Sequence, residues 1–347
     1  MMEALATIAP GRPLREGLDR ILQANMGALI VIGDGPEVLE ICSGGFLVDA
    51  EFSPQRLSEL AKMDGAIVLA ADASRIARAN VHLVPAPSVP TSETGTRHRT
   101  AERVARSVNV PVVSVSEDMG LIAVYRFEEK HPLDPIQRLV NRANQALQTL
   151  ERYRSRFDEV STTLMQLELE DVVTVRDVAA VLQRAEMVRR IAEEIASYIV
   201  ELGSEGRLVL LQLEEVMGGL HDDRRLVLRD YVAEDDGWTA EAALGALAGV
   251  PTDGLVDPAA VARAVRIPGA GLDATVTPRG HRLLGRIPRL AESVAASAVA
   301  EFGSLQRLMR ASVADLGGID GIGERRAQTI KDGLDRLAET VILSSYR

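Results

Sequence analysis

The first 130 residues alternate between two hydrophobic periodicities. Apolar residues recur at three- and four-residue spacing between Leu14 and Met26, which predicts an amphipathic helix that ends at Gly27. Short, continuous apolar runs bounded by polar residues predict buried strands at 28–32, 67–70, 110–115 and 121–125. Fully apolar strands interrupted by helices predict an α/β domain whose sheet is covered by helices on both faces.

The same region contains weaker signals. A strand is expected at 38–42, and Ser53 can cap a helix over 54–62 that has Pro54 at its first position. Another short helix is expected over 102–107. Two prolines within 131–135 predict a linker, because proline interrupts regular structure.

Downstream of this linker the pattern becomes helical. Apolar residues at three- and four-residue spacing, with charges on the opposite face, predict helices at 134–167, 175–202 and 207–217. A polar break is expected at 168–171, and the charged residues of these helices are expected to form a solvated face. Residues 234–270 begin with an acidic turn at 234–237, for which the sequence suggests no function. This region predicts an all-α helical spine.

A glycine-rich hairpin stands out near the C-terminus. Residues 316–330 predict two short helices joined by Gly321-Ile322-Gly323, with an apolar face formed by Leu316, Ile319, Ile322, Ala327 and Ile330. Thirty-two residues earlier, 284–295 repeats the pattern with Arg289 and Ala291 in place of the two glycines. The chain therefore divides into three predicted domains, at 1–135, 136–270 and 271–347.

Composition and charge narrow the classes of protein to which this chain can belong. The 347 residues are 46% hydrophobic, which suits a globular protein of two or three domains. No run of eighteen apolar residues and no signal-like start occur, so we expect a cytoplasmic protein without a membrane partner. The single cysteine, Cys42, excludes an internal disulfide and a multi-cysteine metal site.

The formal net charge of −11 argues against nonspecific nucleic-acid binding by the protein as a whole. The charge is uneven, however: 14 basic and 18 acidic residues in 1–140 give −4, whereas 11 basic and 9 acidic residues in 271–347 give +2. A polyanion partner is therefore expected at the C-terminal domain.

Two turns beside predicted strands carry the candidate chemistry. The first is Lys62-Met63-Asp64-Gly65-Ala66, and the second is Gly95-Thr96-Arg97-His98-Arg99-Thr100-Ala101-Glu102. A carboxylate can hold a divalent cation on a triphosphate, while guanidiniums and hydroxyls bind the remaining oxygens through charge-assisted hydrogen bonds. Thr96 or Thr100 can cap the helix that follows. Neither a Walker loop nor a dinucleotide-binding glycine motif occurs, so this is nucleotide chemistry of another kind.

Asp-Gly-Ala followed by Gly-Thr-Arg-His-Arg-Thr-Ala resembles the paired signature of diadenylate cyclase domains, which condense two ATP molecules into cyclic di-AMP. The resemblance covers about residues 10–135 and implies a mixed sheet flanked by helices. It implies a metal, Mg²⁺ or Mn²⁺, on Asp64, and catalytic roles for Asp64, Arg97, His98 and Arg99. The residues that it implies for ATP binding are Asp64, Gly65, Leu83, Thr96, Arg97, His98, Arg99, Thr100 and Ser116.

The C-terminal hairpins resemble the tandem helix-hairpin-helix domain, in which hairpin amides clasp DNA backbone phosphates without reading bases. This resemblance implies DNA binding through Gly321, Ile322, Gly323, Arg325 and Arg326; in the degenerate copy, Arg286 and Arg289 could contribute charge. The whole chain is similar to the DNA integrity scanning diadenylate cyclases. That family implies a homo-octamer, binding to branched or junction DNA, and cyclase activity that responds to it.

Two alternatives stay open at this point. The protein could be a DNA-binding structural protein whose nucleotide domain senses ATP without catalysis. It could also be another nucleotidyl-transferring enzyme, such as a polymerase or a ligase. Polymerases need several metal-binding carboxylates and ligases a lysine nucleophile, whereas the nucleotide domain has only Lys62 and Lys130, neither in a ligase-like setting.

Overall fold

The computed structural model of the chain describes residues 1–232 and 237–344, with side chains in the last helix as far as Glu339. It divides into two compact units, one formed by 1–146 with 194–212 and the other by 147–193 with the chain from 213 onward. The acidic turn predicted at 234–237 lies outside the described residues, except for Gly237. The three predicted domain boundaries are a different division of the chain and stay a prediction.

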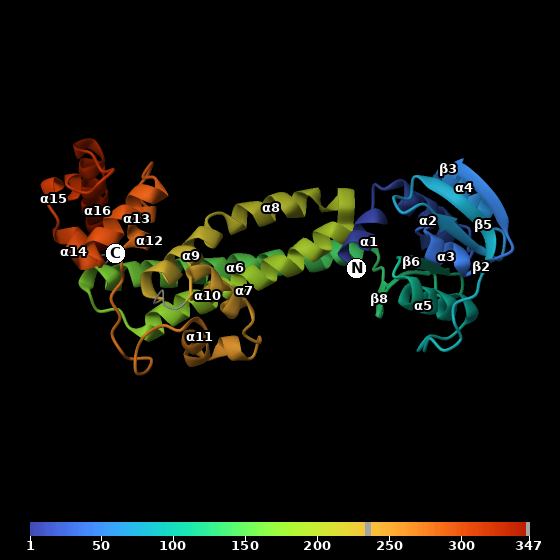
Figure 1. The fold of residues 1–347 in the computed structure, drawn as a ribbon, viewed down its shortest axis with the longest axis horizontal. Coiled ribbons are helices and arrows are strands. Elements are labelled where there is room, and N and C mark those ends of the chain that lie inside the picture. Colours follow the sequence, from blue (N-terminus) through green and yellow to red (C-terminus); the bar gives the residue numbers. More distant parts are fainter. Residues whose placement is uncertain (233–236, 345–347) are drawn as a thin grey trace. The chain divides into compact units, whose positions relative to one another are not determined.

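The N-terminal unit is built on a mixed sheet (Figure 1). Within the described residues the strand order is β2-β5-β4-β1-β6-β7-β8, with β3 paired to β5. The pair β1–β4 is parallel and the other pairs are antiparallel. The strands are β1 Ala28–Ile32, β2 Cys42–Ser43, β3 Phe46–Glu51, β4 Ala66–Leu69, β5 Arg75–Leu83, β6 Val112–Ser116, β7 Leu121–Arg126 and β8 Glu129–Pro132.

Helices cover both faces of this sheet, as the fully apolar strands predict. Because side chains alternate along a strand, Ile30 of β1 points to one face and Val31 to the other. Ile30 shares a buried cluster with residues of α1 (Met2–Thr7), α2 (Pro13–Gln23) and α4 (Pro54–Leu60). Val31 shares a second cluster with residues of α3 (Pro36–Glu40) and α5 (Thr96–Val108).

Downstream of β8 the described elements are helices, with an isolated bridge between Thr174 and Thr275, which confirms the predicted change of class. The long helices are α6 Ile136–Glu170, α7 Val175–Leu202, α8 Arg207–Met217 and α9 Leu220–Tyr231, followed by α10 Ala240–Ala248 and α11 Pro258–Val265. The C-terminal hairpins comprise α12 His281–Gly285, α13 Glu292–Phe302, α14 Leu305–Arg310, α15 Val313–Gly317 and α16 Glu324–Ser344. None of the helices in the described residues combines the length and apolar character that crossing a bilayer requires.

Three local predictions in the N-terminal unit are wrong. The strand expected at 38–42 is mostly helix α3, which begins with Pro36 at its first position and buries Val38. The linker expected at 131–135 contains the end of β8, where Pro132 pairs with Ala123. Proline is tolerated there because β8 is an edge strand and its outer side needs no donor. Neither Thr96 nor Thr100 caps α5, since the cap residue is Gly95 with a φ of 79°.

The expected solvated face of the helical region is also partly wrong, because several charged residues there are buried. Glu168, inside the polar break predicted at 168–171, is the third-last residue of α6 and is 0% exposed. It accepts hydrogen bonds from Arg282 Nη2 at 2.7 Å and from the Tyr231 hydroxyl at 2.8 Å. Glu186 of α7 is buried likewise and pairs with Arg189, Arg190 and Arg224.

Another buried carboxylate lies beside the pair formed by Glu168 and Arg282. Asp230 of α9 accepts backbone N–H bonds from Gly280 at 2.7 Å, His281 at 2.6 Å and Arg282 at 2.9 Å. These amides form the start of α12, so Asp230 satisfies donors that a short helix cannot satisfy itself. We call Glu168, Arg282, Asp230 and Tyr231 the buried network.

The C-terminal hairpin has the predicted apolar face: Leu316, Ile322, Ala327 and Ile330 are buried, and Ile319 packs against the same cluster. Gly321 has a φ of 82°, a conformation that favours glycine.

The degenerate copy keeps this geometry. Arg289, at the position that corresponds to Gly321, has a φ of 64°. The Leu290 amide donates to the Ile287 carbonyl at 3.3 Å, as the Ile322 amide does to the Ile319 carbonyl at 2.9 Å. The repeat found in the sequence is therefore also present in the backbone geometry.

Candidate nucleotide and DNA sites

The two motif turns lie on one cavity of the N-terminal unit. Asp64 and Gly65 lead into β4, whereas Thr96, Arg97 and Thr100 belong to the first turns of α5. Between them lies a cavity of about 310 Å³. It is lined by Leu29, Asp64, Gly65, Ala66, Asn80, Val81, His82, Leu83, Thr96, Arg97 and Thr100.

Asp64 and Arg97 form an ion pair at the cavity. Arg97 Nη2 lies 2.8 Å from Asp64 Oδ1, and the side chains are 38% and 93% exposed. An ion pair in such contact with water contributes roughly 0–1 kcal/mol, so its partners separate easily. Both groups are therefore available to a ligand: the carboxylate to a cation and the guanidinium to a phosphate.

Position 65 must be glycine because the backbone of the neighbouring strand leaves no room for a side chain. A Cβ at this position would lie 2.4 Å from the carbonyl carbon and 2.6 Å from the Cα of Asn80, which are backbone atoms of β5. The backbone that comes close to Gly65 is thus that of β5. It brings Asn80 and His82 to the cavity wall, and sequence reasoning missed both because only the pairing of β4 with β5 places them there.

His98 turns away from this cavity. It is 9% exposed and its Nδ1 lies 2.9 Å from the hydroxyl of Tyr125 on β7. Successive residues of a helix point about 100° apart, so when Arg97 faces the cavity His98 faces the sheet.

Two further predicted ATP residues do not line the cavity either. Arg99 is exposed on α5, and Ser116 lies at the end of β6, where its Oγ accepts the Met119 N–H at 3.3 Å. Their assignment to ATP stays a prediction.

A buried carboxylate fixes the proline-rich loop that leads into α5. Glu102 is 7% exposed and accepts hydrogen bonds from Thr91 Oγ1 at 2.5 Å and from the Ser92 amide at 2.9 Å. Burial alone would raise the pKa of Glu102, but these hydrogen bonds and the charge of Arg106 outweigh it and lower the pKa. The carboxylate therefore stays ionised and holds the loop against the helix that carries Arg97.

The donor set fits a metal that is shared with substrate. Among the described residues, no three His, Cys, Asp or Glu side chains are grouped to hold a metal by themselves. Mg²⁺ typically takes one or two carboxylates together with substrate phosphates. The exposed carboxylate of Asp64 is suited to that role.

The candidate DNA residues divide into one anchor and four exposed positions. Ile322 is 2% exposed and anchors the hairpin in the core. Gly321, Gly323, Arg325 and Arg326 are exposed, and Arg326 Nη1 donates to the Gly321 carbonyl at 2.8 Å.

In the degenerate copy, Arg289 is exposed at the hairpin tip. The Arg286 guanidinium instead contacts the helical region, because its Nη2 donates to Ser161 Oγ at 3.3 Å. Of the two arginines expected to contribute charge, only Arg289 is without such an inward contact.

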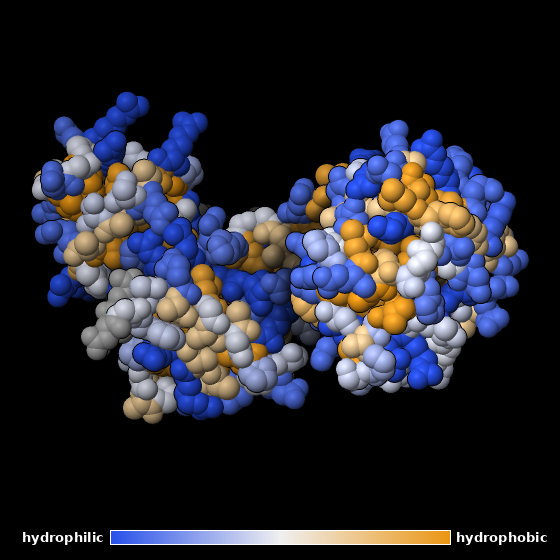
Figure 2. Space-filling model, turned by 45° about the vertical axis from the view of Figure 1, so that its right-hand side comes forward, coloured by the Kyte–Doolittle hydropathy of each residue, from blue (hydrophilic) through white to orange (hydrophobic). Residues whose placement is uncertain are grey.

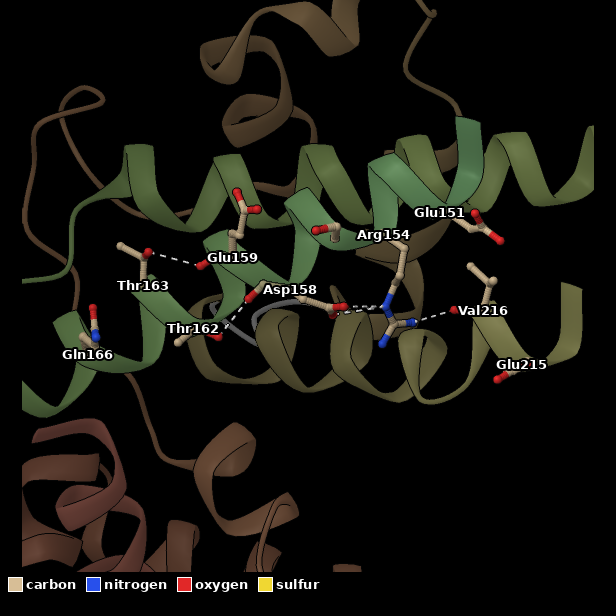
Figure 3. A pocket seen from close by; sticks show the side chains of 10 residues that line it. Glu151, Arg154, Asp158, Glu159, Thr162, Thr163, Gln166, Glu215 and Val216 are labelled. Carbon is tan, nitrogen blue, oxygen red and sulfur yellow. Dashed lines mark hydrogen bonds and ion pairs between the residues drawn. The ribbon is translucent and has the colours of Figure 1, made fainter. Parts of the chain in front are cut away.

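A larger cavity, of about 870 Å³, lies between α6 and α8 in the second unit (Figure 3). Some of its polar side chains already have partners: Arg154 donates to the Val216 carbonyl at 3.1 Å and to Asp158 at 3.0 Å. Thr162 donates to the Asp158 carbonyl at 2.8 Å. This cavity is open and acidic, and it shares no residue with the motif turns.

Comparison with known proteins decides the family. The family model described as DisA bacterial checkpoint controller nucleotide-binding matches residues 15–130, and the model described as the DisA linker region matches residues 133–272. The DNA integrity scanning protein DisA of Kineococcus radiotolerans is 53% identical over 349 residues, which cover 100% of this chain and 97% of that protein. The chain belongs to the DisA family.

A second relative agrees. DisA of Streptomyces coelicolor is 51% identical over 351 residues, covering 100% of this chain and 94% of that protein. A solved structure of DacA from Staphylococcus aureus aligns with 38% of this chain and 86% of its own, at 25% identity and a TM-score of 0.30. DisA membership confirms the resemblance found in the sequence, and the mixed sheet followed by a helical region confirms the predicted fold class.

Proposed function

We propose that this protein is a diadenylate cyclase that condenses two ATP molecules into cyclic di-AMP and two pyrophosphates. One observation carries the proposal: a single cavity joins Asp64 of the first turn to Thr96, Arg97 and Thr100 of the second. The nucleotide-binding description of the family model that matches residues 15–130 supports it, as does the similarity to DNA integrity scanning proteins.

The chemistry follows from the groups at the cavity. The ribose 3′-hydroxyl oxygen of each ATP attacks the α-phosphorus of the other, the bond from that phosphorus to pyrophosphate breaks, and the hydroxyl proton passes to water. Asp64 would hold Mg²⁺ or Mn²⁺, which when bound supplies charge neutralisation for the triphosphate and acidifies the hydroxyl. Arg97, once it leaves Asp64, binds phosphate oxygens through charge-assisted bonds.

One cavity has one set of these groups, whereas the product joins two nucleotides symmetrically. Two copies of the nucleotide unit should therefore face each other across a two-fold axis, with one ATP each. This unit leaves Phe46, Leu47, Met119 and Phe127 exposed, and Figure 2 shows orange, apolar areas on its visible face. The family resemblance extends the assembly to a homo-octamer. Constant specific activity in a dilution series that reaches a true monomer would contradict this arrangement.

The direct test is incubation with ATP and Mg²⁺ or Mn²⁺, followed by detection of cyclic di-AMP. Asp64→Asn should bind ATP and reduce synthesis to below a few per cent, because one amide replaces the proposed metal ligand. Glu59→Gln is the matched control, since Glu59 is an exposed acid of α4 that pairs only with Lys62. ATP binding by the wild type without any product would favour the ATP-sensing alternative.

The C-terminal hairpin is proposed to bind DNA backbone phosphates, with affinity that falls steeply as salt rises because counterions are released. Several hairpins in one oligomer would strengthen weak individual contacts and favour branched DNA. The direction of the effect on synthesis, a decrease on DNA binding, rests on the family resemblance alone.

Gly323→Val tests this module without straining the fold. No atom lies within 4 Å of a Cβ built at Gly323, and its φ is not positive, so the added side chain obstructs only an approaching ligand. We expect weaker junction-DNA binding, by about tenfold or more, with basal synthesis unchanged. Gly245→Val, at an equally open position of α10, is the control. Unchanged DNA binding by Gly323→Val would show that the hairpin is only structural.

A further inference from the structure

Behind the nucleotide cavity, four polar side chains form a chain of contacts. Lys130 Nζ lies 2.6 Å from Glu93 Oε1. The Tyr125 hydroxyl lies 2.9 Å from Nδ1 of His98, and Glu93 is near enough for its charge to act on both groups. Tyr125 is 1% exposed and His98 is 9% exposed, so these two side chains are almost completely shielded from water.

With Glu93 as the acceptor for Tyr125, hydrogen-bond inventory gives the direction of these contacts. A phenol has one proton, and an ionised carboxylate can only accept. Glu93, paired with Lys130, therefore receives the Tyr125 proton. The Tyr125 oxygen must then accept from His98, which places the imidazole proton on Nδ1 and leaves Nε2 as an acceptor when the ring is neutral.

The direction of the pKa shifts agrees with this arrangement. Burial, followed by the charge of Glu93 and a hydrogen bond to it, raises the pKa of the Tyr125 phenol. Burial lowers the pKa of His98, against the charge of Glu93 and with the charges of Lys130 and Arg97. The ring is therefore neutral and the phenol keeps its proton.

The first turn of α5 needs a contact that holds it in place. This helix begins after Gly95, and no side chain caps its first turn. Helix ends without caps fray, yet this turn carries the two groups that face the cavity, Thr96 and Arg97. The bond from His98 to Tyr125 links the turn to β7, the strand next to the edge of the sheet.

We propose that Tyr125 and Glu93 are positioning residues of the nucleotide site: through the Nδ1 proton of His98 they hold the first turn of α5 so that Arg97 and Thr96 face ATP. This inference rests on the proposed function for its ligand. It assigns His98 a structural bond on the sheet side of α5.

The test is Tyr125→Phe, which removes the hydroxyl and preserves the ring. One buried hydrogen bond contributes about 0.5–1.5 kcal/mol, so ATP affinity should fall roughly 2- to 13-fold, with a matching rise in KM and with kcat changed less than twofold. Tyr198→Phe is the matched control, because the exposed Tyr198 hydroxyl donates to Glu194 at 2.6 Å in the same compact unit. It should change neither quantity.

A second readout separates positioning from loss of stability. Solid-state ¹⁵N spectra of histidine-labelled protein, with His98 assigned through His98→Gln, should show the proton on Nδ1 in the wild type and in Tyr198→Phe. In Tyr125→Phe the proton should redistribute toward Nε2. An unchanged tautomer in Tyr125→Phe would overturn the inference, as would a changed tautomer with unchanged ATP affinity.

Neither readout requires turnover. If the wild type bound ATP but made no cyclic di-AMP, the proposed function would fail while the tautomer and the ATP affinity of Tyr125→Phe still decided the role of Tyr125.

Discussion

Two ion pairs of nearly equal length lie in opposite surroundings. Arg97 and Asp64 are 2.8 Å apart with side chains 38% and 93% exposed, whereas Arg282 and Glu168 are 2.7 Å apart with side chains 1% and 0% exposed. The first pair lies at a cavity of the N-terminal unit. The second lies inside the helical unit, which is the unit formed by 147–193 with the chain from 213 onward. The comparison shows that burial, and not distance, decides whether a charge is available for chemistry.

In the buried network, the charged groups pair with partners that are buried themselves. Glu168 accepts from Arg282 and Tyr231, while Arg282 also donates to the Ser161 carbonyl at 3.2 Å. Removing one member of such a pair leaves an uncompensated charge in a dry site, which typically costs about 3–5 kcal/mol. The network therefore fixes α12, the first helix of the hairpin region, to the end of α6.

The largest expected effect is on stability, in Arg282→Met. The variant should lose about 3–5 kcal/mol of unfolding free energy in the helical unit, because Glu168 stays buried without its cation. Urea denaturation followed by circular dichroism measures this. Arg176→Met is the control, since Arg176 pairs with Asp273 at 2.8 Å while both side chains are mostly exposed. A loss below 1 kcal/mol in Arg282→Met would remove the distinction between the two pairs.

The next effect is a pH dependence from Asp230. Burial and the charge of Glu168 raise the pKa of Asp230 to about 7, against the three backbone N–H bonds that lower it. The folded state then holds a proton that the unfolded state releases above its ordinary pKa near 4. The resulting stabilisation is complete below that value and is lost as pH rises through about 7.

Urea unfolding at pH 5 and pH 8 tests this dependence, and Asp230→Asn should reduce the fall in stability between them. The difference between wild type and variant isolates Asp230 from His281, whose pKa burial lowers to about 4 and which acts in the opposite direction. Equal slopes in the two proteins would contradict the assignment.

The smallest effect on stability is expected for Arg97→Met. Because its pair with Asp64 is exposed, the unfolding free energy should change by less than about 1 kcal/mol. Cyclic di-AMP synthesis should nevertheless fall at least tenfold, since the guanidinium is proposed to bind the triphosphate. A stability loss comparable to that of Arg282→Met would show that Arg97 is structural.

Local pattern predicted much of this molecule. The helix at α2 and the strand β1 follow from runs whose apolar periodicity is unambiguous, and Ser53 caps α4 as expected by accepting the Arg56 amide. The hairpin core around Leu316 and Ile322 was also predictable. Asp64 and Arg97 were found because their motifs are contiguous in sequence.

What the sequence could not predict depends on contacts between distant segments. Arg282 lies 114 positions from Glu168, and nothing near Glu168 distinguishes it from an exposed glutamate. Asn80 reaches the cavity wall only through strand pairing, and His98 reaches Tyr125 only because α5 packs on the sheet. Periodicity predicts which face of an element is apolar, but not which polar group on another element will meet it.

A crossed measurement on two carboxylate-to-amide variants tests the central claim most directly. Cyclic di-AMP synthesis and unfolding free energy are measured for Asp64→Asn and Glu168→Gln, at a temperature where both proteins are folded. The account predicts that Asp64→Asn loses synthesis with unchanged stability, whereas Glu168→Gln loses stability and keeps synthesis. Synthesis by Asp64→Asn above a few per cent of the wild-type rate would contradict it.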